Sequence, residues 1–337
     1  MSTPSSEHTV SRRSFLKLAG GAALGAAMFS MPSFSFAREL DNPKRTLKPV
    51  AFKDIPKNAV AAANASPLVQ KSFDDILRLS NTIENGSLRQ AVVRLLNDPT
   101  PTFMQEYSSA ASRSRLYAAL AAQNLIDTSK IDEKHILPPF NGAVQKFKTA
   151  PGSGYGSHHP YPGGLATHTS CNMHITDYIC RTYEEVFYYS VNKDIAIAAQ
   201  ALHDISKPFV FQWNANGSSL TEYPIAGQGA HHALALAEVI YRGFPAEEVV
   251  AQACAHGAPT SKKEEADVAG WLKAAAIIAG KDPVATASSA KTARRFPSPT
   301  IRKVTSSTSA TTTGYCRRRQ PRKRSCSSKK SPIRNTA

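Results

Sequence analysis

The amino-acid sequence predicts an all-α protein. Between residues 68 and 279, apolar residues recur with the 3.6-residue period of a helix, whereas few segments alternate with the two-residue period of a strand. Proline and glycine gather between these periodic segments, as they do at helix ends. Hydrophobic residues make up 42% of the 337 residues, which excludes wholesale disorder. No run of 18 apolar residues occurs outside the first forty, which excludes a polytopic membrane protein.

Residues 1–37 carry the features of an export signal. Residues 11–17, SRRSFLK, resemble the S-R-R-x-F-L-K pattern of bacterial twin-arginine signals, and residues 35–37 provide the small side chains that a signal peptidase requires. The stretch 18–31 is rich in glycine and alanine and is too short and weakly apolar for a stable membrane span. We therefore expect a twin-arginine signal peptide, the twin-arginine export machinery as a partner, and a periplasmic or otherwise exported protein.

The region 38–150 is expected to be a lead-in followed by an N-terminal helical extension. Scattered prolines predict an extended chain over 38–66. Residues 68–97 are helical by period, with a break at Asn85-Gly86, and Pro101 is placed to start a further helix that reaches about residue 126. Residues 138–163 contain five prolines and five glycines and predict a long loop, a feature that is often functional in compact domains.

The region 151–282 is expected to be the main helical domain. Helices are predicted at 165–183, 193–203, 231–241, 245–256 and 266–279. The fourth of these has Pro245 at its start, Glu247 and Glu248 in its first turn, and Gly257 placed to end it.

The formal net charge of +16 comes from the two ends of the chain. Residues 283–337 contain 14 basic and no acidic residues, whereas residues 38–282 contain 24 of each. A nucleic-acid partner is therefore not expected. The segment 283–337 is rich in serine and threonine and has no apolar period, which predicts a disordered basic tail. Its abrupt start is equally what a frame-shifted end of the sequence would produce, and both interpretations stay open.

Eight of the ten histidines lie between residues 158 and 256, and four different predicted helices each offer at least one of them. Imidazole and carboxylate groups are the usual ligands of Zn, Fe, Mn and Ni, and helical bundles build metal sites from side chains on facing helices. His203 and Asp204 are adjacent, so on a continuous helix they would point ~100° apart. Both reach one ion only near a helix end, or if Asp204 bridges two ions. Pro208 favours a helix end here.

Two strings are similar to those of a known family. Residues 158–169, HHPYPGGLATHT, resemble H-x-Y-x-G-G-L-x-x-H-T, and residues 202–208, LHDISKP, resemble L-H-D-I-G-K, both found in the HD-domain superfamily of metal-dependent phosphohydrolases. The resemblance covers about 155–280 and implies an HD-domain helical bundle that binds one or two divalent ions of Mn, Fe, Ni or Zn. It implies that Asp204 and Lys207 are catalytic, Lys207 by approaching a substrate phosphate. The implied metal ligands are His168, His203, Asp204, His232 and His256.

The resemblance implies hydrolysis of a phosphomonoester or phosphodiester, with a phosphate-containing small molecule or nucleotide as substrate. His232 is preferred to its neighbour His231 for its position relative to the apolar face of the helix. His158 and His159 are either surface residues of the loop or residues on the substrate side. The family's final aspartate is replaced by Ala276 at the expected position. A domain that binds a ligand or partner without turnover is therefore one alternative. A di-iron oxygenase is the other, because some HD-type di-iron proteins perform oxygenation.

Overall fold

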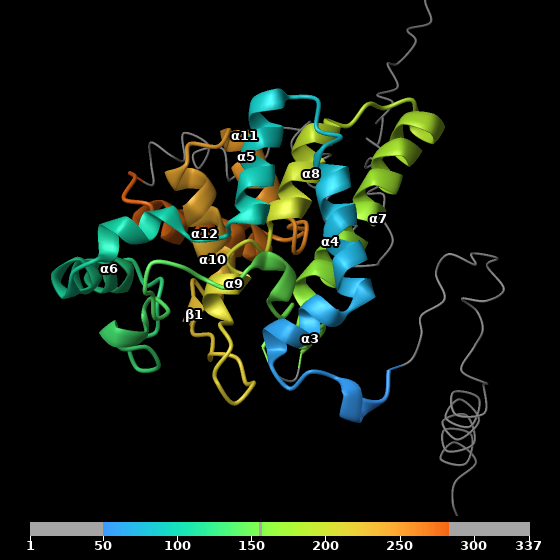
Figure 1. The fold of residues 1–337 in the computed structure, drawn as a ribbon. Helices are drawn as coiled ribbons and strands as arrows, with labels where there is room; N and C mark the ends of the chain where they lie inside the picture. Colours follow the sequence, from blue (N-terminus) through green and yellow to red (C-terminus); the bar gives the residue numbers. More distant parts are fainter. Residues whose placement is uncertain (1–49, 155–156, 283–337) are drawn as a thin grey trace, which may run out of the picture. The chain divides into compact units, whose positions relative to one another are not determined.

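The structure is a computed structural model that describes residues 50–154 and 157–282 (Figure 1). The expected signal peptide at 1–37 and the expected tail at 283–337 lie outside the described residues. The chain divides into two units, one ending at Ile55 and the other starting at Pro56. In the first unit a short 3-10 helix, η2, spans Phe52–Asp54.

Three helices begin the second unit: α3 spans Ala59–Ala65, α4 spans Pro67–Ser80 and α5 spans Gly86–Asn97. Each starts at a side chain that accepts a hydrogen bond from the backbone three residues later. Asn58 accepts from Ala61, Ser66 from Val69 and Asn85 from Leu88, which satisfies a backbone donor that the first turn leaves free. The predicted break at Asn85-Gly86 is therefore confirmed, and Asn85 acts as the cap of α5. The prediction of an extended chain over 38–66 is wrong at α3.

The single helix predicted over 101–126 is also wrong. The structure instead has a 3-10 helix, η3, at Thr102–Tyr107, and then α6 at Ala110–Ala122. The buried carboxylate of Glu238 accepts hydrogen bonds from the backbone N–H groups of Thr102 and Phe103 at 2.8 and 3.3 Å. The hydroxyl of Ser109 starts α6 separately by accepting from the backbone of Ser112 at 3.1 Å. These side-chain hydrogen bonds start two separate helices within a segment whose apolar period predicts a single helix.

The predicted loop at 138–163 is confirmed over residues 138–154 and 157–163, apart from a short 3-10 helix, η5, at Phe147–Thr149. Another short 3-10 helix, η4, spans Glu133–His135. The helices predicted after the loop are all present with shifted ends. The largest C-terminal extension is that of α7, which continues four residues past the predicted end at residue 183. Their bounds are α7 Gly164–Phe187, α8 Lys193–Leu202, α10 Ala230–Tyr241, α11 Ala246–Ala253 and α12 Lys262–Ile278.

Three short elements between α8 and α10 were not predicted. The short helix α9 spans Lys207–Val210, and strands β1 (Pro224–Ile225) and β2 (Gln228–Gly229) form a small antiparallel pair. The strand pair leads directly into α10. None of the helices in the described part of the chain has both the length and the apolar character that a membrane crossing needs.

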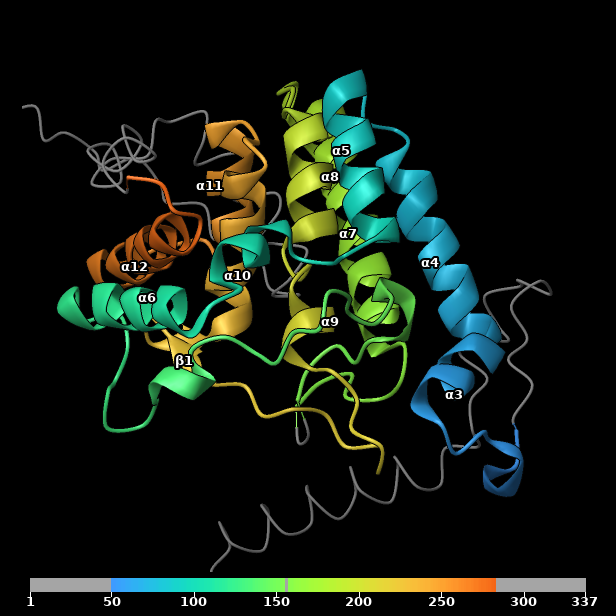
Figure 2. The same cartoon turned by 60° about the vertical axis from the view of Figure 1, so that its left-hand side comes forward.

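The helices form two packed groups (Figure 2). In the first group α4 packs on α7, and α5 and α7 pack on α8; in the second, α10 packs on α11 and α12. Contacts of α8 with α11 join the groups. The buried faces of both groups belong to one continuous apolar core, which includes Met173, Leu202 and Leu236. The all-α prediction is confirmed, and the arrangement fits an HD-like helical bundle. The end of α8 lies where the two groups meet.

Candidate metal centre

His203 and Asp204 lie at the end of α8, where the sequence predicts that the helix stops. Helix α8 ends at Leu202, His203 is its C-cap, and Asp204 lies in the turn that leads to α9. Both side chains are buried, with 1% and 0% of their surface exposed. The Nδ1 atom of His203 lies 2.8 Å from the backbone oxygen of Gln200 and donates to it. This hydrogen bond leaves the lone pair of a neutral His203 on Nε2, which faces Asp204.

His168 joins this pair from α7. Its Nε2 atom lies 3.2 Å from Nε2 of His203 and 3.3 Å from Oδ2 of Asp204, and Nε2 of His203 lies 3.1 Å from the same oxygen. Asn172, one turn later on α7, brings its amide nitrogen to 3.1 Å from Nε2 of His168. His168 is placed here because Gly163, with φ of +80°, turns the loop into the start of α7.

The other oxygen of Asp204 faces a second group of histidines. Nε2 of His256, in the turn after α11, lies 3.5 Å from Oδ1 of Asp204, and Nε2 of His231, in the first turn of α10, lies 3.6 Å from it. His232 completes this group, because its ring centroid lies 4.0 Å from that of His256. Donor atoms of His231, His232 and His256 all lie within 4.8 Å of one another. Each oxygen of Asp204 therefore faces its own set of imidazoles.

His231 and His232 differ in their surroundings. His232, preferred by the sequence argument, packs its ring on Trp271 at 4.8 Å between centroids, and its Nδ1 is buried without a hydrogen-bond partner in the described part of the chain. His231 is the one that points Nε2 at Asp204. The structure brings both histidines to the centre, so the choice of His232 as ligand stays a prediction and His231 becomes an additional candidate.

Glu222 is a site residue that the sequence argument missed. One carboxylate oxygen of Glu222, Oε1, accepts from Nδ1 of His231 at 2.6 Å and from its backbone N–H at 2.8 Å. A Cβ atom at Gly229 would lie 2.5 Å from the other oxygen of Glu222, so a side chain there would displace this carboxylate. Such a carboxylate–histidine contact fixes the tautomer and puts the lone pair of His231 on Nε2. No local signal in the sequence marks Glu222, because it reaches His231 across the β1–β2 turn.

Lys207 lies in the first turn of α9 and is buried. Its Nζ atom lies 2.7 Å from Oδ2 of Asp204 and donates to the backbone oxygen of Gly152 at 2.5 Å. The ammonium group therefore holds the shared carboxylate and fastens the loop before α7 to it. The predicted contact of Lys207 with a substrate phosphate stays a prediction, although Lys207 also lines the cavity described below.

The protonation states suit metal binding. Burial alone would raise the pKa of Asp204, but His203 and Lys207 and the hydrogen bonds to the carboxylate hold that pKa well below its usual range. Burial lowers the pKa of His168, against the opposing effect of Asp204. Burial, reinforced by neighbouring imidazoles, places the pKa values of His232 and His256 well below the usual histidine range. Metal ligands must be neutral imidazoles and ionised carboxylates, and these groups are in that state near pH 7.

The residues present fit a divalent transition metal. Oδ1 of Asp204 and Nε2 of His256 are buried and have no hydrogen-bond partner in the described part of the chain. At metal–ligand bonds of ~2.1 Å, donor atoms about 3.2 Å apart would subtend an angle of ~100° at an ion, between the octahedral and tetrahedral values. The separations around Oδ2 of Asp204, from 3.1 to 3.3 Å, meet this condition.

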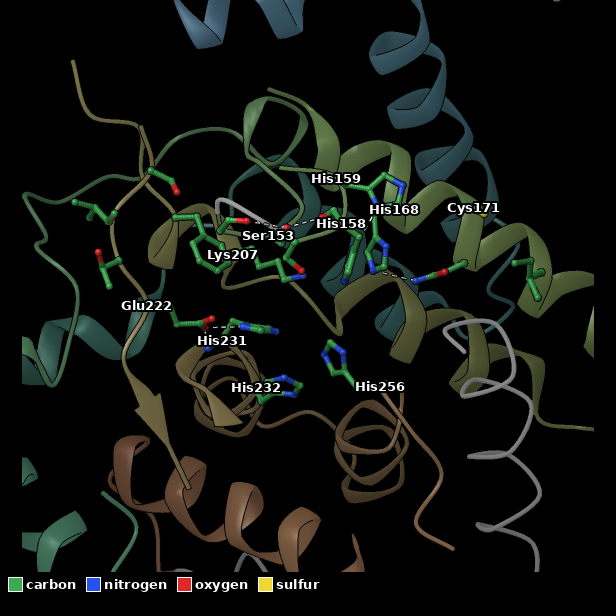
Figure 3. A pocket seen from close by; sticks show the side chains of 18 residues that line it. Ser153, His158, His159, His168, Cys171, Lys207, Glu222, His231, His232 and His256 are labelled. Atoms are coloured by element: carbon green, nitrogen blue, oxygen red, sulfur yellow. Dashed lines mark hydrogen bonds and ion pairs between the residues drawn. The ribbon is translucent and has the colours of Figure 1, made fainter. Parts of the chain in front are cut away.

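A cavity of about 770 Å³ opens in front of the centre (Figure 3). His158, His159 and His168 line one side of it, and Glu222, His231, His232 and His256 line the other. Lys207 reaches it as well. Its volume lies in the range of pockets that bind small molecules. The arrangement can hold a metal ion against the cavity and admit a small molecule to it.

Trp271, on α12, is the side chain that lies against this centre from the last helix. It packs on His232 and borders the space between His232 and His256. Ala276, expected at the position of the missing aspartate, is buried on the same helix, five residues further along. A bulky indole, not a small alanine, therefore closes this side of the centre.

The comparisons with known proteins give a partial match. The chain is 37% identical over 100 residues to the dihydroneopterin 2',3'-cyclic phosphate phosphodiesterase of Methanocaldococcus jannaschii. The aligned region is 30% of this chain and 39% of the relative, so the chain spans well under half the length of the protein it matches. No protein-family model and no solved structure matches the chain.

Proposed function

We propose that the chain is a metal-dependent phosphohydrolase that hydrolyses a small phosphodiester or phosphomonoester. The observation that carries this proposal is the position of Asp204, whose two oxygens face two separate groups of imidazoles beside a cavity. The similarity to a cyclic phosphate phosphodiesterase supports phosphoester chemistry and makes cyclic phosphodiesters the first substrates to try.

The proposed ligands are His168, His203 and Asp204 for one ion and Asp204 with His256 and His231 or His232 for a second. A divalent metal bound there supplies Lewis acidity toward phosphate oxygens and lowers the pKa of a bound water. Lys207 holds the shared carboxylate in place at 2.7 Å. Glu222 holds His231 in one tautomer. The phosphate group of the substrate enters from the cavity side, where His231 and His256 are partly exposed.

The test is turnover by the metal-loaded protein. We expect phosphate-ester hydrolysis with Mn²⁺ or Fe²⁺ on a panel of cyclic diesters, linear diesters and monoesters, lost on chelation and restored by the metal. The same assay without oxygen separates this function from a di-iron oxygenase, which requires oxygen. A metal-loaded protein that hydrolyses none of the panel would favour a binding module instead.

We also propose that the protein is exported by the twin-arginine route. The support is the SRRSFLK string at residues 11–17. Replacing both arginines, Arg12→Lys with Arg13→Lys, should leave unprocessed precursor in the cytoplasm, detected by fractionation and blotting. Normal processing of this double variant would remove the export proposal.

A further inference from the structure

The loop before α7 holds two further histidines over the proposed centre. The ring centroids of His158 and His159 lie 4.9 and 5.3 Å from that of His168. Both side chains line the cavity, on the side away from His231 and His256 (Figure 3). Neither His158 nor His159 is among the side chains that pair with the carboxylate of Asp204 in the described part of the chain. Their position is therefore beside the proposed metal ligands, facing the space that a substrate would occupy.

The backbone of His158 and His159 is held in place from several sides. His159 has φ of +56°, in the left-handed region that residues with a side chain rarely adopt. A Cβ atom at Gly152 would lie 2.8 Å from Cβ of His159, and one at Gly164 would lie 2.0 Å from its backbone oxygen, so both glycines are required. The hydroxyl of Ser153 donates to the backbone oxygen of His158 at 2.5 Å. Backbone strain that the surroundings impose in this way is concentrated at functional sites.

The two imidazoles also orient each other. Their Nδ1 atoms lie 3.2 Å apart, with the rings nearly perpendicular at 82°. One Nδ1–H must donate to the other Nδ1 for this contact to be a hydrogen bond. The accepting ring, when neutral, then carries its proton on Nε2. The pair therefore has one N–H donor left to offer to a ligand, in a fixed direction.

The surrounding charge favours a ligand with anionic oxygens. Among the residues that line the cavity in the described part of the chain, Glu222 is the one acid, and its carboxylate is engaged with His231. The ammonium group of Lys207 is bonded to Gly152 in the same loop. The hydroxyl groups of Ser157 and Thr221 line the same space. Imidazole and hydroxyl donors beside a buried cation suit the oxygens of a phosphate group.

We propose that His158 and His159 form a phosphate-oxygen subsite, which binds the substrate oxygens that point away from Asp204. The pair is then a determinant of substrate affinity and orientation, not a set of metal ligands. For catalysis the inference rests on the proposed function, but for binding it does not, because inorganic phosphate fits the same subsite.

Inorganic phosphate is accordingly the probe. We would titrate it calorimetrically into the Mn²⁺-loaded full chain and measure bound manganese in each variant. His158→Leu removes the imidazole, His158→Gln keeps an amide N–H, and His159→Gly removes the second imidazole while suiting the left-handed backbone. We expect phosphate affinity to fall about tenfold in His158→Leu and His159→Gly, and less in His158→Gln, with manganese content unchanged. His174→Leu is the control, because His174 lies on α7 but pairs with Asp75 at 3.5 Å.

Two results would overturn the proposal. One is an unchanged phosphate affinity in both His158→Leu and His159→Gly. The other is a loss of manganese from these variants, which would make the pair metal ligands. If the wild type binds phosphate with the predicted dependence on His158 and His159 but hydrolyses no phosphoester, the subsite stands and the proposed hydrolysis fails. Where hydrolysis is measurable, the same substitutions should raise KM more than they lower kcat.

Discussion

The two sides of the Asp204 carboxylate are built differently. On the Oδ2 side, His168 and His203 come from α7 and the end of α8; the side chain of His203 is fully buried, and that of His168 is 10% exposed where it lines the cavity. On the Oδ1 side, His231 and His256 come from α10 and the turn after α11, and their side chains are 12% and 20% exposed to the cavity. The group at Oδ2 is therefore the more enclosed of the two, and the group at Oδ1 is the more open to small molecules.

Because of this difference, we expect the two groups to bind metal ions with different affinities. An enclosed set of donors is already oriented, so little ordering is needed when an ion binds, and its affinity should be high. An open set must leave coordination positions for water or substrate, as catalytic metal sites do. The comparison therefore predicts a tight ion beside His168 and His203 and a weaker, exchangeable ion beside His231 and His256. The following predictions test this asymmetry.

Removing the carboxylate that both sides share should have the largest effect. Asp204→Ala leaves the buried ammonium group of Lys207 unpaired, which costs about 3–5 kcal/mol, and removes a ligand from both ions. We expect bound metal below about one tenth of the wild-type amount and a clear drop in Tm. Asp204→Asn keeps the volume of the side chain, so it should fold better than Asp204→Ala but still lose metal.

Metal analysis and thermal unfolding are the measurements. The control is Asp267→Asn, which breaks an exposed pair with Lys263. Full metal occupancy in Asp204→Asn would show that the site is misassigned.

Substituting one histidine on each side should affect the binding of the two ions differently. His203→Gln removes a buried ligand and should weaken the tight ion by more than 100-fold while lowering Tm, because an ion bound to the native state stabilises it. His256→Gln should leave the tight ion in place and release the weaker one. Equilibrium metal titration of each variant gives the answer. Equal effects of the two substitutions would remove the asymmetry.

The carboxylate behind His231 should have a smaller effect, confined to the open side. Glu222→Ala frees the His231 ring and should weaken the second ion by about 10–100-fold, the range found for carboxylates that orient metal-bound histidines. Glu222→Gln keeps a neutral oxygen that can accept from the same two N–H groups and should lose less. Competition with a chromophoric chelator measures both. Exposed Glu184 on α7 supplies the control, Glu184→Ala. Equal loss of both ions would contradict a role restricted to His231.

The smallest expected effect is the pH dependence of the metal-free protein. The pKa values of His168, His232 and His256 are lowered in the folded chain, whereas in the unfolded chain they are about 6.5. As the pH falls below about 6.5, the unfolded chain takes up protons that the folded chain does not, so stability is present above this pH and is lost on acidification. We expect Tm to fall between pH 7.5 and 5.5, and to fall less in His168→Gln. As a control, His174→Gln should show the same dependence of Tm on pH as the wild type. A Tm that rises over this interval would contradict the assignment of neutral imidazoles.

The sequence predicted those parts of the site that local patterns encode. His203 and Asp204 lie at a helix end, as Pro208 and the end of the apolar run indicate, and the loop before α7 leads to His168 as the glycine pair predicts. The sequence did not predict Glu222 or the direction of His231, because their contact depends on a turn between them that carries no strong local signal. The split of 101–126 was missed for a similar reason, since Glu238, far along the chain, holds the start of η3. Long-range hydrogen bonds decided each of these cases.

The most direct test of the central claim, that Asp204 joins two metal-binding groups, is the number of ions bound per chain. Mn²⁺ titrated into chelator-treated full chain should bind at two sites, with affinities at least about tenfold apart. His256→Gln should retain the tighter site alone, and Asp204→Asn should lose both. Absence of specific Mn²⁺, Fe²⁺, Ni²⁺ or Zn²⁺ binding, or two sites that persist in Asp204→Asn, would contradict the account.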